Sequence, residues 1–93
     1  MDFIKENERI YANDKDGKLI AEIRFSLKKG IAVITHTFVD ESLRGQGIAS
    51  QLVRLAVEQI RKNGVPVAAT CSYAQLWLQR HPEHQPVNPS SHH

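Results

Sequence analysis

A short glycine-containing loop between a strand-like segment and a helical segment most constrains what this chain can fold into. The loop consists of Arg44, Gly45, Gln46, Gly47, Ile48 and Ala49. β-branched residues are frequent in the preceding segment, 31–39, and apolar residues recur at helical spacing over 47–63. Two glycines let the backbone turn and approach a ligand closely, because no Cβ stands in the way. We therefore predict a strand-to-helix connection that can contact a ligand.

The predicted helix starts without an acidic side chain, and the first acid within it is Glu58. Helix N-termini have free N–H groups and a positive dipole end, which an Asp, Glu, Ser or Thr side chain usually satisfies. A helix start without an acid suits an anion such as a phosphate.

Three phosphate-binding motifs can be compared with this loop. A Walker P-loop ends in Gly-Lys-Ser/Thr, which residues 47–49 do not match. A dinucleotide fingerprint needs a third glycine where Ser50 stands, and an acid after a second strand. The pyrophosphate loop of acetyl-coenzyme A enzymes has the pattern Gln/Arg-x-x-Gly-x-Gly/Ala, and Arg44, Gly47 and Ala49 match each fixed position. An ordinary glycine-containing turn is the alternative interpretation.

The sequence on both sides of the loop resembles the GNAT superfamily of N-acetyltransferases. Residues 34–49 look like its strand, bulge and coenzyme A (CoA) loop. Residues 71–73 (Cys-Ser-Tyr) and 81–83 (His-Pro-Glu) look like its short, single-domain, CoA-binding branch. The resemblance covers about residues 8–84 and implies a minimal GNAT-like fold with acetyl-CoA as co-substrate.

Hydrophobic patterning predicts an α/β (α+β) fold with one mixed sheet. Four strands are expected, at residues 9–13, 19–27, 31–39 and 65–70. The first three form an antiparallel start, and the helix over 47–63 makes a β-α-β crossover to a parallel fourth strand. A C-terminal helix should begin at Ser72, with Gln75 completing a capping box.

The same patterns assign faces to side chains. In the segment 19–27, the residues expected to point away from the apolar face are Glu22, Arg24 and Ser26. In the second helix, the residues expected on the side toward the sheet or the ligand are Tyr73, Leu76, Trp77 and Arg80.

The GNAT resemblance also implies where the coenzyme binds. The pantetheine arm would lie along the third strand near Thr37, Phe38 and Val39. The amides of loop 44–49 would take the pyrophosphate, and the Arg44 side chain could add a charge-assisted contact.

Three residues are candidates for catalysis. Cys71 lies between a strand end and a helix start, where the helix dipole can lower the pKa of a thiol; inert packing is the alternative. The resemblance favours Cys71 as a catalytic residue and Tyr73 as the acid that protonates the leaving CoA, although Tyr73 could be an ordinary surface aromatic. His36 could act as a base or be a satisfied core histidine. The glutamate that many GNAT enzymes use as base has no counterpart at Phe38 or Val39.

Composition limits the function further. The 93 residues suit one domain, 1–84, followed by a polar tail, 85–93. A net charge of +2 without a basic run longer than two lysines argues against a function in nucleic-acid binding.

The single cysteine and the absence of a long apolar segment predict a cytoplasmic protein without a disulfide or a membrane span. Cys71, His81 and His84 form an incomplete set of zinc ligands, so we expect no metal.

The sequence thus predicts an acetyl-CoA-binding N-acyltransferase that acetylates an unidentified amine. The alternative is a CoA-binding module or sensor with little or no transferase activity. A nucleic-acid-binding domain is a third and less favoured hypothesis. The oligomeric state stays open.

Overall fold

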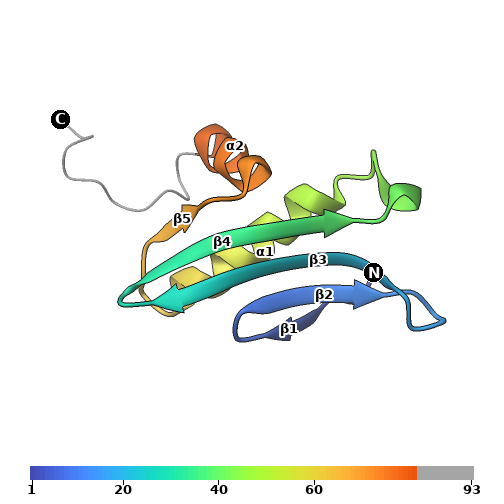
Figure 1. Ribbon diagram of the computed structural model, residues 1–93, viewed down its shortest axis with the longest axis horizontal. Coiled ribbons are helices and arrows are strands. Elements are labelled where there is room, and N and C mark those ends of the chain that lie inside the picture. The colour runs from blue at the N-terminus through green and yellow to red at the C-terminus, as the bar shows by residue number, and fades with distance from the viewer. Residues whose placement is uncertain (82–93) are drawn as a thin grey trace.

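The computed structural model describes residues 1–81 of the chain as one mixed sheet with two α-helices (Figure 1). The elements in chain order are β1 (Ile4–Glu6), β2 (Arg9–Asn13), β3 (Leu19–Lys28), β4 (Ile31–Val39), the 3₁₀ turn η1 (Glu41–Leu43), α1 (Ile48–Lys62), β5 (Val67–Ala69) and α2 (Ser72–Arg80). The strands are ordered β1-β2-β3-β4-β5 in space. The predicted mixed α/β class is confirmed, while the expected tail, 85–93, and His84 lie outside the described residues.

The sheet contains a strand that the sequence did not predict. β1 pairs antiparallel with β2, with Ile4 opposite Tyr11 and Glu6 opposite Arg9. All three of its side chains are exposed, so no alternation of apolar and polar residues marks it. A second contact comes from α1, where the Gln59 side-chain amide donates to the Glu6 carbonyl at 2.7 Å. The prediction that Arg9–Asn13 is the first strand was therefore wrong, because β1 is held by pairing rather than by burial.

The expected parallel crossover is present. β4 and β5 pair in parallel from Ala32 opposite Val67 to Ile34 opposite Ala69. β5 is shorter than the predicted 65–70, since it contributes three paired residues and then turns into α2. The backbone N–H groups of Thr70 and Cys71 both donate to the Ile34 carbonyl, at 2.9 and 3.3 Å, which closes the pairing.

A bulge interrupts the pairing of β3 with β4. Arg24 lies opposite His36, but Phe25 lies opposite Ile34, which leaves Thr35 as the extra residue of β4. The bulge changes the alternation of side chains along β4, so that the side chains of Ile34 and Thr37 both point to the face covered by α1. This is where the superfamily resemblance implied a bulge.

The core lies between α1 and one face of the sheet, and the opposite face is open toward the viewer in Figure 1. From α1 the buried residues are Ile48, Leu52, Val53, Ala56, Val57 and Ile60. From the sheet they are Ile10, Ala12, Ala21, Ile23, Phe25, Ala32, Ile34 and Val67. This apolar stripe along α1 agrees with the helical spacing of the sequence.

α2 packs beside β5 and differs from its prediction in two ways. Gln75 does not form a capping box; its side-chain amide donates to the Ala69 carbonyl at 3.0 Å, across the turn that leads into the helix. The buried residues of α2 are Ala74, Trp77 and Leu78. Leu76 and Arg80, which were expected on the side toward the sheet or the ligand, are instead exposed, because the short helix covers only the end of the sheet.

Two features are missing from residues 1–81. Neither helix is long and apolar enough to cross a membrane. No group of three or more His, Cys, Asp or Glu residues in this part of the chain could hold a metal ion.

Candidate functional site

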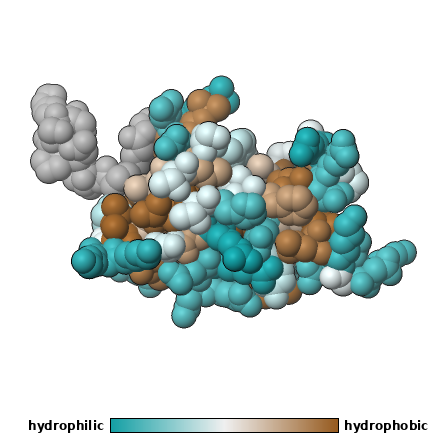
Figure 2. Space-filling model, viewed as in Figure 1, coloured by the Kyte–Doolittle hydropathy of each residue, from teal (hydrophilic) through white to brown (hydrophobic). Residues whose placement is uncertain are grey.

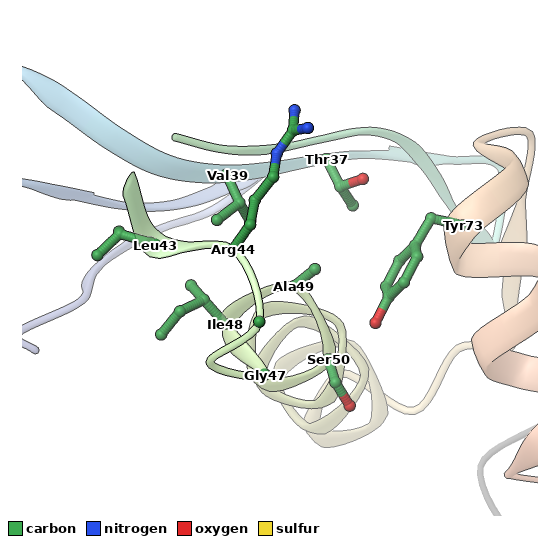
Figure 3. A pocket seen from close by; sticks show the side chains of 10 residues that line it. Thr37, Val39, Leu43, Arg44, Gly47, Ile48, Ala49, Ser50 and Tyr73 are labelled. Carbon is green, nitrogen blue, oxygen red and sulfur yellow. The ribbon is translucent and has the colours of Figure 1, made fainter. Parts of the chain in front are cut away.

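A pocket of about 450 Å³ opens between the end of β4, the start of α1 and the start of α2 (Figure 3). Its walls come from segments far apart in the sequence. The lining residues are Thr37, Val39, Leu43, Arg44, Gly45, Gly47, Ile48, Ala49, Ser50 and Tyr73.

The segment that leads from β4 to α1 is fixed by Asp40. This carboxylate accepts hydrogen bonds from the Ser42 backbone N–H at 3.1 Å and the Ser42 hydroxyl at 2.6 Å. Lys18 approaches it from the β2–β3 turn at 3.7 Å. The Ser42 hydrogen bonds, more than the lysine, hold the pKa of Asp40 below its ordinary value. The loop therefore begins from an ordered turn.

The start of α1 has an open backbone. Gly47 is the N-cap in the left-handed conformation, with φ 74°, and no side chain caps the helix. Such a φ favours glycine because other residues are strained there. The first turn contains no acid, and the first intrahelical donor is Gln51, whose N–H bonds the Gly47 carbonyl at 3.1 Å. The N–H groups before Gln51 therefore have no acceptor within the helix and lie at the pocket.

The edge of β4 forms the second wall. Thr37 and Val39 point into the pocket, on the same face as Ile23, which pairs with Thr37 and is fully buried. β5 does not extend beyond Ile34, so among residues 1–81 no strand pairs with this edge of β4 over 35–39. Backbone groups there can accept an extended ligand as they would accept a strand.

The start of α2 forms the third wall. Tyr73 projects toward Ala49 and Ser50 of α1 (Figure 3). One turn further along α2, the Trp77 indole N–H donates to the Ser50 hydroxyl at 2.9 Å and links α2 to the start of α1.

Cys71, the N-cap of α2, stands next to this wall without lining the pocket itself. Its Sγ lies 3.5 Å from the Thr37 hydroxyl. Partial burial raises the pKa of the Cys71 thiol, but the Thr37 hydroxyl and the backbone N–H groups of Ala74 and Tyr73 outweigh it, so the net pKa is below the ordinary value. These N–H groups act mainly through their partial charge, since the Cys71 side chain forms no capping hydrogen bond.

The structure thus brings together most of the residues that the sequence singled out. Those in the pocket wall are Thr37, Val39, Arg44, Gly45, Gly47, Ile48, Ala49 and Tyr73, and Cys71 is joined to them through Thr37. Phe38 and Gln46 belong to the same segments but do not line the pocket. His36 lies on the opposite, open face of the sheet, where it is half exposed, so it is not a satisfied core histidine.

Two pocket residues, Leu43 and Ser50, were not singled out from the sequence. Both flank the loop, and their closeness to it was the only signal. A charged cluster around Glu22 on the open face was also missed, because alternation alone predicted an ordinary outward-facing acid.

Comparison with known families gives a direct answer. The sequence model of the family described as GCN5-related N-acetyl-transferase matches residues 9–87. The chain belongs to this family. No curated protein matches the chain.

Solved structures with the same fold include members that bind CoA. A GCN5-like protein of Staphylococcus aureus, determined by NMR, is 26% identical with a TM-score of 0.75, over 99% of this chain and 95% of that one. The GNAT family N-acetyltransferase YhbS of Escherichia coli, in complex with CoA, is 28% identical with a TM-score of 0.57. Rv2747 of Mycobacterium tuberculosis, also in complex with CoA, is 20% identical with a TM-score of 0.65, which supports the fold alone.

The GNAT chain described here matches these relatives to different extents. The match covers 66% of this chain and 38% of YhbS, and 81% of this chain and 47% of Rv2747. This chain therefore spans less than half of the length of YhbS and of Rv2747. The staphylococcal protein, in contrast, has nearly the same length as this chain.

Proposed function

We propose that this protein uses acetyl-CoA to acetylate an amine. The observation that carries the proposal is the pocket in which the uncapped start of α1 meets an edge of β4 that no strand of residues 1–81 pairs with. The N–H groups near Gly47 provide donors and a positive dipole end for the pyrophosphate. Arg44, in the same wall, adds a cation. The complex of YhbS with CoA supports this assignment.

The remainder of the coenzyme would run from the α1 start along β4. The edge of residues 35–39 offers backbone groups for the amides of the pantetheine arm. Thr37 and Val39 would flank the arm, which directs its thioester end toward Cys71 and Tyr73. This path agrees with the resemblance-based expectation for the third predicted strand.

In the reaction, the amine nitrogen attacks the thioester carbonyl, a C–N bond forms and the C–S bond breaks. The amine loses one proton and the departing CoA sulfur gains one, so the products are an amide and CoA thiol. Tyr73 is the candidate donor of that proton because its hydroxyl projects into the pocket. In the alternative, covalent route, the Cys71 sulfur, whose pKa is lowered, attacks the thioester carbonyl; its S–C bond forms, the C–S bond to CoA breaks and the thiol proton passes to the CoA sulfur. The amine then attacks the Cys71 thioester, forms the amide and returns a proton to the Cys71 sulfur.

One observation favours the alternative of a CoA-binding module. No carboxylate and no imidazole lines the pocket within the described residues, so the pocket itself offers no general base for the amine. His36 could act only from the open face, around the edge of β4. An enzyme of this design would depend on amine that is already neutral, and a binding module would not need a base at all.

Two measurements test the proposal. Acetyl-CoA should raise the melting temperature by mass action, because it binds the folded chain. Thiol release from acetyl-CoA should then accelerate when primary amines are added. A melting shift without amine-dependent thiol release would favour the binding module, and the absence of a shift at millimolar acetyl-CoA would contradict both functions.

A further inference from the structure

A cluster of charged side chains lies on the open face of the sheet, and Glu22 is at its centre. This residue is 4% exposed. Arg9 and Arg24 donate from their Nε atoms to its Oε2, Arg24 at 3.1 Å. The Nε2 atom of His36 lies 3.6 Å from its Oε1. Figure 2, in the same view as Figure 1, shows hydrophilic side chains gathered across the middle of this face.

Glu22 organises the cluster rather than exchanging protons. Burial raises the pKa of its carboxyl, but the hydrogen bonds from Arg9 and Arg24 lower it more, and the net pKa is below the ordinary value. A buried charge is tolerated only when it is paired. The carboxylate therefore stays ionised and holds the two guanidinium groups in place.

The two arginines differ in their remaining capacity to bind. Arg9 also approaches Glu6 at 3.9 Å and lies 3.7 Å from the centre of the Tyr11 ring, so it is engaged on several sides. Arg24 is anchored through Nε, and its side chain is 59% exposed. The outer fork of a guanidinium anchored in this way is suited to a carboxylate, which it can bind through two parallel hydrogen bonds.

The cluster and the pocket lie on opposite sides of the same strand. His36, which is opposite Arg24 in the register, directly precedes Thr37 of the pocket wall. Because β5 ends its pairing at Ile34, no strand separates the two faces along residues 35–39 in the described structure. The pantetheine arm would run along this edge from Val39 and end at its thioester near Thr37. A molecule on the open face can thus approach the acyl group around the edge at residues 35 and 36.

Building on the proposed function, we propose that the acceptor is an amine that also carries a carboxylate, which Arg24 binds on the open face. Arg9 is balanced by both Glu22 and Glu6, whereas the ion pair of Arg24 within residues 1–81 is with Glu22, a carboxylate that it shares. In this scheme Arg24 determines specificity and Glu22 is a positioning residue. The amine is acetylated as described above, while the acceptor's carboxylate takes no part in the chemistry.

Matched acceptors test the inference. The kcat/KM of thiol release is measured for glycine, β-alanine and γ-aminobutyrate, each against its primary amide. It is also measured for alanyl-aspartate against alanyl-asparagine, both with an amidated C-terminus, so that the aspartate carboxylate is the only difference. We expect the acid to be preferred about tenfold or more at the best spacing, as for a charge-assisted hydrogen bond. Preference in the dipeptide pair alone would identify a peptide as the source of the carboxylate.

Variants of Arg24 test whether this side chain causes the preference for the acid over the amide. Arg24→Gln should abolish the preference, Arg24→Lys should keep part of it, and Arg24→Glu should reverse it toward the amide. Lys28→Ala removes an exposed cation from the same strand and should leave the preference unchanged. Equal use of acid and amide by the wild type, or a preference that survives Arg24→Gln in a folded protein, would overturn the inference.

Failure of the transferase proposal can be distinguished from failure of the proposal that Arg24 binds a carboxylate. If acetyl-CoA raises the melting temperature but no amine is acetylated, the same acid and amide pairs are titrated into the CoA complex and followed by NMR. Acid-specific shifts around Arg24 and His36 that disappear in Arg24→Gln would support carboxylate binding. The absence of such shifts would overturn it, whatever the result of the acetyl-CoA titration.

Discussion

The starts of the two helices meet at one pocket but differ in what they present to it. α1 follows Gly47, whose left-handed backbone and missing side chain leave only N–H groups. α2 follows Cys71, which places a thiol within reach of Thr37 and beside the first N–H groups. Neither helix start has a side-chain cap or an acid in its first turn.

The difference shows how one physical feature can support two roles. A helix start without a side chain is suited to bind an anion that arrives from outside. A helix start next to a thiol instead favours the thiolate, so the dipole acts on the protein's own group. We therefore expect α1 to control binding and α2 to control chemistry, and the following predictions test that division.

The largest effect is expected at Gly47. A Cβ there would meet nothing within 4 Å, so a side chain extends into the open region beside the pocket. Gly47→Glu should abolish the acetyl-CoA-induced melting shift, because it adds bulk and negative charge at the pyrophosphate position.

Gly64 provides a matched control for Gly47. It has the same φ of 74°, and a Cβ added to it would also meet open space, but it follows the other end of α1. Gly64→Glu should therefore cause comparable backbone strain while retaining the melting shift. Equal loss of the shift in both variants would show that strain, not the pocket, is responsible.

The second effect concerns turnover. Cys71→Ala should lower turnover at least about tenfold, a minimum that lies below the usual range for a lost catalytic group, and leave acetyl-CoA affinity within a few-fold. A covalent route would also leave an acetylated protein, detected by mass spectrometry and missing in the variant. If Tyr73→Phe loses activity while Cys71→Ala keeps it, Tyr73 is the acid and the thiol has a packing role.

The third effect is on the titration of Cys71. Alkylation of the folded chain should reach its half-maximal rate at a lower pH than alkylation of the chain unfolded in urea, because the folded pKa is depressed. Thr37→Val should move the midpoint upward, since the Thr37 hydroxyl lowers the pKa. By linkage, ionisation of Cys71 stabilises the fold fully above the unfolded pKa, and this contribution is lost as the pH falls through the folded pKa.

The smallest effect is on stability. Ser50→Ala removes the acceptor of the Trp77 N–H and with it a link between α2 and the start of α1. The free energy of unfolding should fall by about 1 kcal/mol in urea denaturation followed by circular dichroism. Ser26→Ala, on an outward-facing position of β3, is the control and should have a smaller effect.

Local patterns in the sequence predicted much of the fold. β2 and β4 have the predicted bounds, and β3 differs by one residue. The helix over 47–63 was identified by its apolar stripe, whose members are nearly all buried. β1 could not be predicted because its stability comes from its partner strand. The capping box at Ser72 was wrong because the N-cap is Cys71, which places Gln75 one position beyond the N3 of a capping box.

The candidate site likewise has one part that the sequence predicted and another that it did not. The loop motif alone indicated residues 44–49, because glycine spacing and the lack of an acid are local properties. The distance between Thr37 and Cys71, 34 positions apart in the chain, arises only when β5 pairs with β4 and stops at Ile34.

By itself, the sequence determined the order of β2 to β5 and the two α-helices, the glycine loop and the position of the only cysteine, since each depends on residues close together in the chain. Only the tertiary structure decided that two helix starts share one pocket and that His36 faces away from it. It also decided that Glu22, an outward-facing acid by alternation, is buried under Arg9 and Arg24. The reason is physical: pairing register, the bulge at Thr35 and side-chain burial depend on contacts between distant segments.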